Sequence, residues 1–296
     1  MSPPRPPILF AAALGATSST DLYTIDESGH VERLTNTPED ELFPRWSPNR
    51  DRLAFVSNAR LFVAGYDGTG VHLVADHVGR NGRFPLEAST QEVTAADWSP
   101  DGQRLVYSYP RKPVMVDFGD EIVDESYATT LHFVNADGTG DVAWNEPSTG
   151  GTPPEFYTIT EPAWSSSGRL AFHLADDCSD CAGGYWFGTA GADGTGYADV
   201  TADQRIPNHD LDWAPDGARW TATVHANWRY ESPGRIAVFA SGVVTELTTD
   251  GAYMPRWSQD GGAIAFLRAD GIYVMNADGT NQRRVLAVTG VRGIDW

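Results

Sequence analysis

The stretch Trp98-Ser99-Pro100-Asp101-Gly102, followed closely by the apolar run Leu105-Val106-Tyr107, recurs with small changes along the chain. Pro presets φ, Asp bonds nearby backbone and Gly supplies positive φ, so the polar half predicts a tight hairpin. The apolar half is rich in strand formers and predicts a buried strand. The other copies begin at Trp46, Trp164, Trp213 and Trp257, and successive tryptophans are 52, 66, 49 and 44 residues apart. Spacings of this size match four-stranded propeller blades, and the longer ones indicate insertions.

A second turn signal follows in most units, at Asp67-Gly-Thr-Gly70, Asp137-Gly-Thr-Gly140, Asp193-Gly-Thr-Gly196 and Asp278-Gly-Thr-Asn281. Each copy offers one carboxylate, whereas calcium loops need several, so hairpin turn chemistry is the better interpretation. Each unit is therefore predicted to run strand, turn, strand, loop, strand, turn, strand.

The two ends of the chain complete one another. The sixth unit stops at Gly293-Ile-Asp-Trp296, and the stretch from Ser2 to Phe10 aligns residue for residue with the stretch from Ser99 to Tyr107. We therefore expect the N-terminal residues to supply the second strand of the blade that the C-terminus begins, which removes both free sheet edges. The predicted fold is an all-β, six-bladed propeller of four-stranded antiparallel blades, with residues 1–296 as a single domain.

The combined pattern resembles a known repeat family. The Trp-Ser-Pro-Asp-Gly signature, the Leu/Ile-Ala-Phe strand and the Asn-Ala-Asp-Gly-Thr-Gly turn are similar to the repeats of the TolB C-terminal propeller and its relatives, over essentially the whole chain. The resemblance implies a scaffold that binds a partner on one face or in its central channel. Similar repeats occur in propeller domains of prolyl-oligopeptidase-type peptidases and in some lyases, so the fold alone does not choose a function. The sequence has no Gly-x-Ser-x-Gly nucleophile elbow, which argues against a serine peptidase.

Charge and hydropathy narrow the class of partner. Forty acidic and twenty-one basic residues give a formal net charge of −19, which repels phosphate backbones and anionic headgroups. We therefore expect neither a nucleic acid nor a membrane as partner, and we expect a monomer. The apolar stretch from Ile8 to Leu14 is too short for a bilayer span, and its removal as a secretory signal would delete a strand of the closing blade. These observations favour the cytoplasm over the periplasm or secretion.

Insertions in neighbouring units favour a site on the face where the innermost strands begin. They cover residues 80–92, 110–127, 176–184 and 227–233, and loops carried by a rigid scaffold often hold functional residues. The catalytic candidates, which offer acid/base groups near these insertions, are His173, His209, His225, Tyr109 and Glu161. The ligand-binding candidates, which offer aromatic area and polar anchors, are Tyr107, Asp176, Asp177, Asp210, Trp228, Arg229 and Tyr230.

The histidines have two other interpretations. In the first, His173 and His225 lie at strand ends and pack between blades, and His209 caps a polar turn. In the second, the three histidines bind a metal together with Glu161 or Asp210. We predict no metal ligands and no cofactor, and a divalent cation is the alternative.

A ring of alternating charge is also visible in the sequence. The residues just before the six signature tryptophans are, in order, Arg45, Asp97, Ala163, Asp212, Arg256 and Asp295. Mutual charge satisfaction between blades is the favoured interpretation, and a binding role for the ring is the alternative.

Two functions fit these observations. The leading hypothesis is a binding or interaction protein that presents an asymmetric, acidic-rimmed funnel to a small ligand or a protein partner. The alternative is a lyase, isomerase or cyclase that uses the His, Tyr and Glu candidates for acid/base chemistry on a small organic molecule. Only the enzyme hypothesis requires those side chains to lie within hydrogen-bond reach of one another or of a shared substrate.

Overall fold

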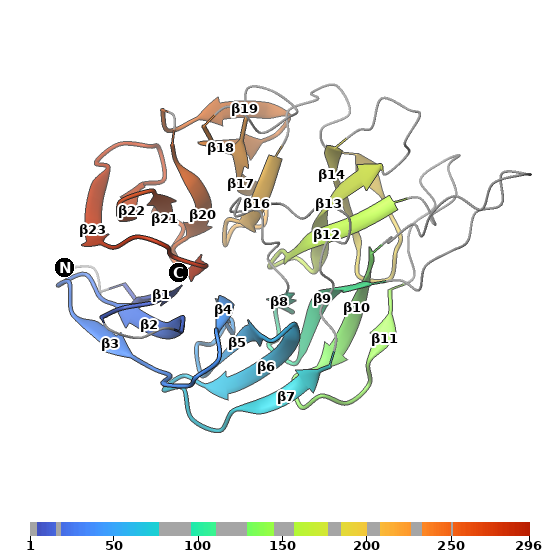
Figure 1. Ribbon diagram of the computed structural model, residues 1–296. Helices are drawn as coiled ribbons and strands as arrows, with labels where there is room; N and C mark the ends of the chain where they lie inside the picture. The colour runs from blue at the N-terminus through green and yellow to red at the C-terminus, as the bar shows by residue number, and fades with distance from the viewer. Residues whose placement is uncertain are drawn as a thin grey trace, which may run out of the picture.

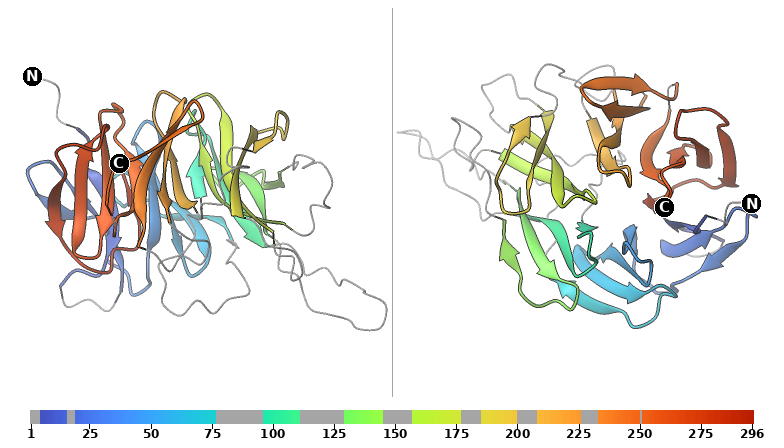
Figure 2. Two further views of the ribbon diagram at one scale, coloured as in Figure 1. Left: turned by 90° about the horizontal axis from the view of Figure 1, so that it is seen from above. Right: turned by 180° about the vertical axis from the view of Figure 1, so that it is seen from behind.

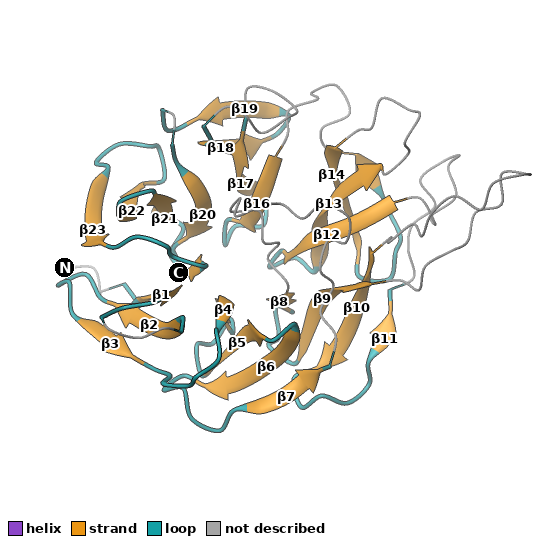
Figure 3. Ribbon diagram, viewed as in Figure 1, coloured by secondary structure: helices purple, strands orange, loops and turns teal. Residues whose placement is uncertain are grey.

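The computed structural model describes residues 5–15, 19–76, 96–110, 129–144, 157–176, 185–199, 208–225, 233–249 and 251–296. Six four-stranded sheets, the blades, stand around a central channel (Figure 1). Figure 2 shows the same ring from above and from behind, and Figure 3 shows strands as the only regular elements among the described residues. Within the same residues, no helix has the length and apolar character needed to cross a bilayer. The predicted all-β, six-bladed propeller is confirmed.

The strands are numbered in chain order, and each blade runs from its innermost strand outward. Blade 1 contains β24 (Ile294–Asp295), β1 (Ile8–Ala12), β2 (Asp21–Ile25) and β3 (Val31–Arg33). Blade 2 contains β4 (Leu42–Trp46), β5 (Arg52–Ser57), β6 (Arg60–Gly65) and β7 (His72–Ala75). Blade 3 contains β8 (Ala96–Trp98), β9 (Arg104–Pro110), β10 (Thr129–Asn135) and β11 (Val142–Ala143).

The remaining three blades follow the same order. Blade 4 contains β12 (Tyr157–Trp164), β13 (Arg169–Asp176), β14 (Tyr185–Gly191) and β15 (Ala198–Asp199). Blade 5 contains β16 (Asn208–Trp213), β17 (Arg219–Val224), β18 (Arg235–Ala240) and β19 (Val243–Glu246). Blade 6 contains β20 (Tyr253–Trp257), β21 (Ala263–Arg268), β22 (Gly271–Asn276) and β23 (Arg283–Ala287).

Blade 1 closes the ring with strands from both ends of the chain. β1 lies beside the C-terminal end of the chain (Figure 1), where it pairs with β2 on one side and with β24 on the other. In this pairing Leu9 lies opposite Asp295. Val106 lies opposite Asp97 in the same way in blade 3, so the alignment of the N-terminal residues with the repeat holds to the residue. The predicted closure by N- and C-terminal strands is confirmed.

The hydrophobic core is divided among the interfaces between blades. Six apolar clusters of buried side chains lie among the described residues, each between two adjacent blades. β1 shows why the strand residues are apolar on both sides: Leu9 and Ala11 pack toward blade 2, whereas Ile8, Phe10 and Ala12 pack toward blade 6. Successive side chains alternate between the faces of a strand, so a strand buried on both faces needs a continuous apolar run.

The hairpin that follows each signature tryptophan has the predicted turn chemistry. In blade 3, the N–H of Ser99 donates to the carbonyl of Arg104 at 2.9 Å, and the Ser99 hydroxyl donates to Oδ1 of Asp101 at 2.6 Å. Gly102 has a φ of 66°, which costs a glycine little. The polar signature therefore acts as a local turn between the innermost strand and its neighbour.

The Asp-Gly-Thr turns also use their carboxylates internally. Oδ1 of Asp137 accepts hydrogen bonds from the N–H of Thr139 at 2.9 Å and from its hydroxyl at 2.7 Å. The copies at Asp67, Asp193 and Asp278 make the same pair of bonds. These bonds confirm the turn interpretation over calcium loops.

The innermost strands share a bulge three residues before the tryptophan. Pairing with the second strand shifts register there in β4, β12, β16 and β20. The residues at this position, which all have positive φ, are Phe43, Glu161, Asp210 and Met254. Positive φ is uncommon for residues other than glycine, but its recurrence with four different side chains makes it a feature of the blade. A bulge redirects the side chain that it carries, which decides where Glu161 and Asp210 point.

Candidate functional site

The ring of charge around the channel joins neighbouring blades. Asp97, Asp212 and Asp295 each accept, through Oδ2, the backbone N–H of a tryptophan in an adjacent blade. The partners are Trp164 at 2.6 Å, Trp257 at 2.7 Å and Trp46 at 2.7 Å, respectively. Buried Arg45 adds an ion pair to Asp295 at 3.2 Å. These contacts support the predicted charge satisfaction between blades.

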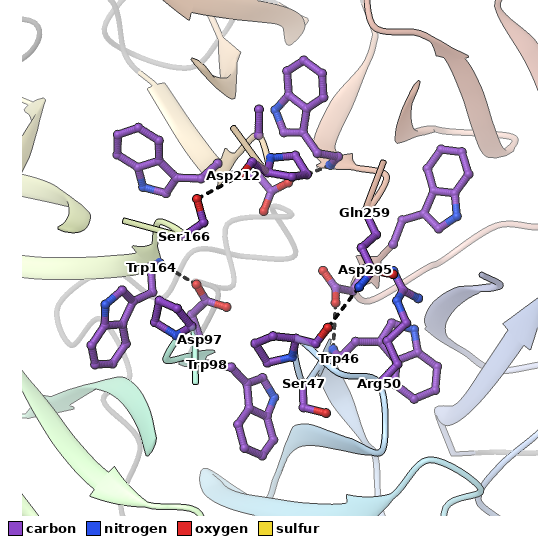
Figure 4. Close-up of a pocket in the computed structure, with 17 residues that line it drawn as sticks. Trp46, Ser47, Arg50, Asp97, Trp98, Trp164, Ser166, Asp212, Gln259 and Asp295 are labelled. Atoms are coloured by element: carbon purple, nitrogen blue, oxygen red, sulfur yellow. Dashed lines mark hydrogen bonds between the residues drawn. The ribbon is translucent and has the colours of Figure 1, made fainter. Parts of the chain in front are cut away.

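A cavity of about 340 Å³ opens at the tryptophan end of the channel (Figure 4). Its walls include the six signature tryptophans, Asp97, Asp212, Asp295, Arg50 and Gln259. In Figure 4 the three carboxyl groups point toward the channel centre, and the labelled indole rings extend away from it. Burial raises the pKa of Asp97 to about 6 and that of Asp212 to about 7. The insertions favoured a site at the other end of the channel, where the innermost strands begin, so this cavity was not predicted. The alternating charges just before the signature tryptophans were the sequence signal that pointed to it.

The second polar centre lies where the innermost strands of blades 4 and 5 begin. Glu161, His173, His209, Asp210 and His225 form this histidine cluster, and their exposed fractions are 3% to 9%. Glu161 and Asp210 occupy the bulges of β12 and β16, and His209 directly precedes Asp210. His173 lies on β13 and His225 directly follows β17, on the second strands of the same two blades. The fold therefore gathers four of the five catalytic candidates and one ligand-binding candidate.

A hydrogen-bonded chain of carboxylate, imidazole and imidazole runs through the cluster. Nδ1 of His209 donates to Oδ2 of Asp210 at 2.6 Å, because an ionised carboxylate only accepts. Nε2 of His209 lies 2.8 Å from Nε2 of His225, so one proton lies between the two rings. The same oxygen of Asp210 also accepts from the hydroxyl of Thr223 at 2.8 Å and from the N–H of Met254 at 3.2 Å. The chain is thereby fixed at its carboxylate end.

Glu161 joins the cluster through only one of its oxygens. Oε2 accepts the backbone N–H of Asp210 at 2.6 Å. Oε1 makes no hydrogen bond within the part of the chain that the structure describes. His173 stands nearby on the paired strand, where its Nδ1 lies 3.4 Å from the hydroxyl of Thr160. A buried carboxyl with one oxygen held and the other open has the geometry of an acid/base group.

The environment separates the pKa values of four of the five ionisable groups of the cluster. Burial and, as a smaller cause, the neighbouring Asp210 carboxylate together raise the pKa of Glu161 to about 7. Burial opposes ionisation of Asp210, but the imidazole of His209 outweighs it and lowers the pKa of Asp210 to about 2. Burial disfavours the protonated form of His209, yet the carboxylates of Asp210 and Glu161 raise the pKa of this imidazole. Burial lowers the pKa of His173 to about 3, so this ring is neutral. Groups whose environments separate their pKa values in this way are typical of acid/base sites.

Part of the cluster also serves the fold. Glu161 accepts the N–H of Asp210 in blade 5, and Asp210 accepts the N–H of Met254 in blade 6. These bonds join blades as the aspartates of the charge ring do, so the packing interpretation accounts for the two carboxylates. The bonds from Asp210 to His209 and from His209 to His225 run within blade 5 and do not join blades.

The tyrosine candidates contact a different histidine. The ring of Tyr109 stacks on His132 with centroids 4.2 Å apart, and the hydroxyl of Tyr107 donates to Oδ2 of Asp141 at 2.7 Å. Asp141 also accepts from His132 at 2.9 Å, so these residues form a separate network in blade 3. The sequence indicated the chemistry of these side chains but not the face of the strand that they occupy.

Several candidates lie at or beyond the edge of the described residues. Asp176 is the last residue of β13. Asp177, Trp228, Arg229 and Tyr230 lie outside the described residues. In the described ranges, no group of three or more His, Cys, Asp or Glu side chains is arranged to hold a metal ion.

Comparisons with known proteins agree on the architecture. Residues 15–108 match the model of the dipeptidyl peptidase IV N-terminal region. A structure of a putative TolB from Agrobacterium tumefaciens superimposes with a TM-score of 0.62 at 17% identity, over 99% of this chain and 92% of that one. No curated protein matches in sequence.

Proteins with other roles share the fold. A nidogen/laminin complex contains a chain with a TM-score of 0.62 at 11% identity, over 98% of this chain and 97% of that one. An oligogalacturonate lyase in complex with manganese has a TM-score of 0.59 at 18% identity, over 94% of this chain and 73% of that one. Identities this low show the fold alone, so the function has to be argued from the site.

Proposed function

We propose that this TolB-like propeller is a binding protein that takes a small polar molecule at the histidine cluster. The observation that carries the proposal is the buried chain from Asp210 through His209 to His225, with separations of 2.6 and 2.8 Å. Burying such groups costs free energy that apolar side chains at the same positions would not cost. A ligand that uses their hydrogen bonds explains why they are there.

The charge state of the cluster defines the kind of ligand. The carboxylate of Asp210 is in direct contact with His209, and although burial disfavours the protonated imidazole, this carboxylate raises the pKa of His209, so the negative charge of Asp210 has a partner within the cluster. Uncompensated full charge on the ligand would meet a desolvation cost in this environment. We therefore expect a small molecule rich in hydroxyl or carbonyl groups, which exchanges hydrogen bonds with imidazole and carboxyl groups.

The test is a thermal-shift screen of polar metabolites with the wild-type protein and two histidine variants. His225→Gln removes one ring of the chain, whereas His132→Gln removes a histidine of the separate network in blade 3. A ligand at 100 times its dissociation constant stabilises the folded state by about 2.7 kcal/mol. We expect that stabilisation in the wild type and in His132→Gln, and we expect it to be lost in His225→Gln. Equal shifts in all three proteins would place the ligand elsewhere and refute the proposal.

An enzyme is the second candidate function, and one observation favours it. The open oxygen of Glu161 lies in the same cluster, with a pKa of about 7. A binding site has no need of a half-ionised carboxyl, whereas a proton-transfer site does.

A further inference from the structure

We propose that Glu161 is a general base that removes a proton from a carbon atom of the molecule bound at the histidine cluster. The inference rests on the proposed binding function and adds a reaction to it. The substrate class is a carbon acid, a molecule whose C–H bond is activated by an adjacent carbonyl or similar group.

Glu161 differs from another buried glutamate of the same protein. Glu41 is 2% exposed, and its oxygens accept the hydroxyls of Thr35 at 2.7 Å and Thr37 at 2.6 Å. Both of its oxygens are therefore used by the fold. Glu161 is 8% exposed, and only Oε2 is held, by the N–H of Asp210. Oε1 has no hydrogen-bond partner in the described part of the chain, and it is not among the fully buried atoms that lack one, so it is open to solvent or to a bound molecule.

The backbone fixes the orientation of this carboxyl. The β12 bulge gives Glu161 a φ of 51° and sets its side chain against the bulge of β16. One short hydrogen bond fixes Oε2, so Oε1 is positioned without needing a substrate to order it. A base held in place loses little entropy when it reacts.

The electrostatic surroundings also suit a base. Burial raises the pKa of Glu161 to about 7, so the carboxylate is a stronger base than an exposed glutamate and still ionises near neutral pH. The ionisable and charged groups that act on it are Asp210 and His209 of the cluster and buried Arg256 on β20. Asp210 strengthens the base, His209 and Arg256 favour its ionised form, and Arg256 provides positive charge near the anion that forms in the substrate. His209 acts as a positioning residue through its bond to Asp210.

The proposed step is balanced without any co-reactant. The C–H bond of the substrate breaks, its proton goes to Oε1 of Glu161, and the electron pair moves onto the adjacent carbonyl oxygen to give an enolate. In a substrate with a C=C bond between its β- and γ-carbons, return of the proton from Oε1 to the γ-carbon moves that double bond into conjugation with the re-formed carbonyl and completes an isomerisation. The carboxylate is regenerated, and no oxidation or reduction occurs.

The test uses two carbon acids that require no knowledge of the natural substrate. 5-Nitrobenzisoxazole opens to a coloured cyanophenolate when a base removes its ring proton, and nitroethane, which is smaller, exchanges its α-hydrogens in D₂O. We expect the wild type to accelerate at least one reaction, with a rate that rises with pH through one ionisation near 7. We expect Glu161→Gln to lower that rate by about 10²-fold or more, and the matched variant Glu41→Gln to leave it unchanged.

The outcomes separate this inference from the proposed binding function. Rates with both probes that are equal in the wild type and Glu161→Gln overturn the general base, whether or not a metabolite still stabilises the protein. If the Gln variant fails to fold, the wild-type pH profile decides instead: no ionisation between pH 6 and 8 overturns the inference. Retention of the ligand-induced thermal shift in Glu161→Gln, with loss of the probe reaction, supports both proposals.

Discussion

Replacement of Glu161 by Gln should change how the stability of this protein depends on pH. The carboxyl has an ordinary pKa of 4.5 and a pKa of about 7 in the folded protein, because burial disfavours its charged form. A carboxyl with a raised pKa stabilises the folded state at low pH, and this stabilisation is lost as the pH rises from the unfolded to the folded pKa. The variant lacks the titrating group and should escape that loss.

The magnitude follows from the two pKa values. Each unit of difference corresponds to about 1.4 kcal/mol, so the full effect between pH 4.5 and 7 is about 3 kcal/mol. Between pH 5 and pH 8, the wild type should lose about 2 to 3 kcal/mol that Glu161→Gln retains. Gln keeps an oxygen that accepts the N–H of Asp210, so the hydrogen bond between blades survives the change.

The assay is urea unfolding of both proteins at pH 5, 6, 7 and 8. The free energy of unfolding of Glu161→Gln minus that of the wild type should increase steadily as the pH rises, because only the wild type loses stability. His209 and Asp210 titrate in both proteins, so their contributions largely cancel in this difference. Glu32→Gln on exposed β3 controls for the loss of one negative charge and should follow the wild type. Parallel pH curves for wild type and Glu161→Gln would refute the electrostatic reasoning for the cluster.

Two further predictions concern the ring closure. Asp295→Ala removes the acceptor for the N–H of Trp46 and the ion-pair partner of Arg45, a side chain that is only 4% exposed. This variant should lower the free energy of unfolding by about 3 to 5 kcal/mol, as measured by urea titration. Gly293→Ala should also destabilise the protein, because Gly293 has a φ of 133° and an added Cβ would lie 2.8 Å from Cα of Phe43. Thermal unfolding should show a loss of at least about 1 to 3 kcal/mol.

Two matched variants control these predictions. Asp270→Ala breaks an exposed ion pair with Arg284, and it should change stability little. Gly290→Ala also introduces a Cβ at positive φ, but no atom lies within 4 Å of it, so it should cost less than Gly293→Ala. If Asp295→Ala cost no more stability than Asp270→Ala, or Gly293→Ala no more than Gly290→Ala, the contacts at the ring closure would contribute nothing to stability beyond what the control positions contribute.

The sequence by itself determined the architecture of this protein because the signals that specify it are local. Pro, Asp and Gly set turn geometry within a few residues, and apolar runs between them specify strands buried on both faces. Repetition of one unit then specifies a ring, and the alignment of Ser2 to Phe10 with Ser99 to Tyr107 showed how that ring closes. The chemistry of the site was visible in the same way, as histidines and acids near insertions.

Only the tertiary structure decided which of these groups meet. A bulge shifts register by one residue, and this brings Glu161 of blade 4 onto the backbone of Asp210 in blade 5, 49 residues away. The sequence does not show which face of β9 each side chain occupies. In the structure Tyr107 and Tyr109 belong to a separate network with Asp141 and His132, away from the histidine cluster with which they were grouped. The cavity at the tryptophan end also exists only once six blades surround one channel. Contacts between blades depend on the packing of whole sheets, and a pattern read along one strand does not contain them.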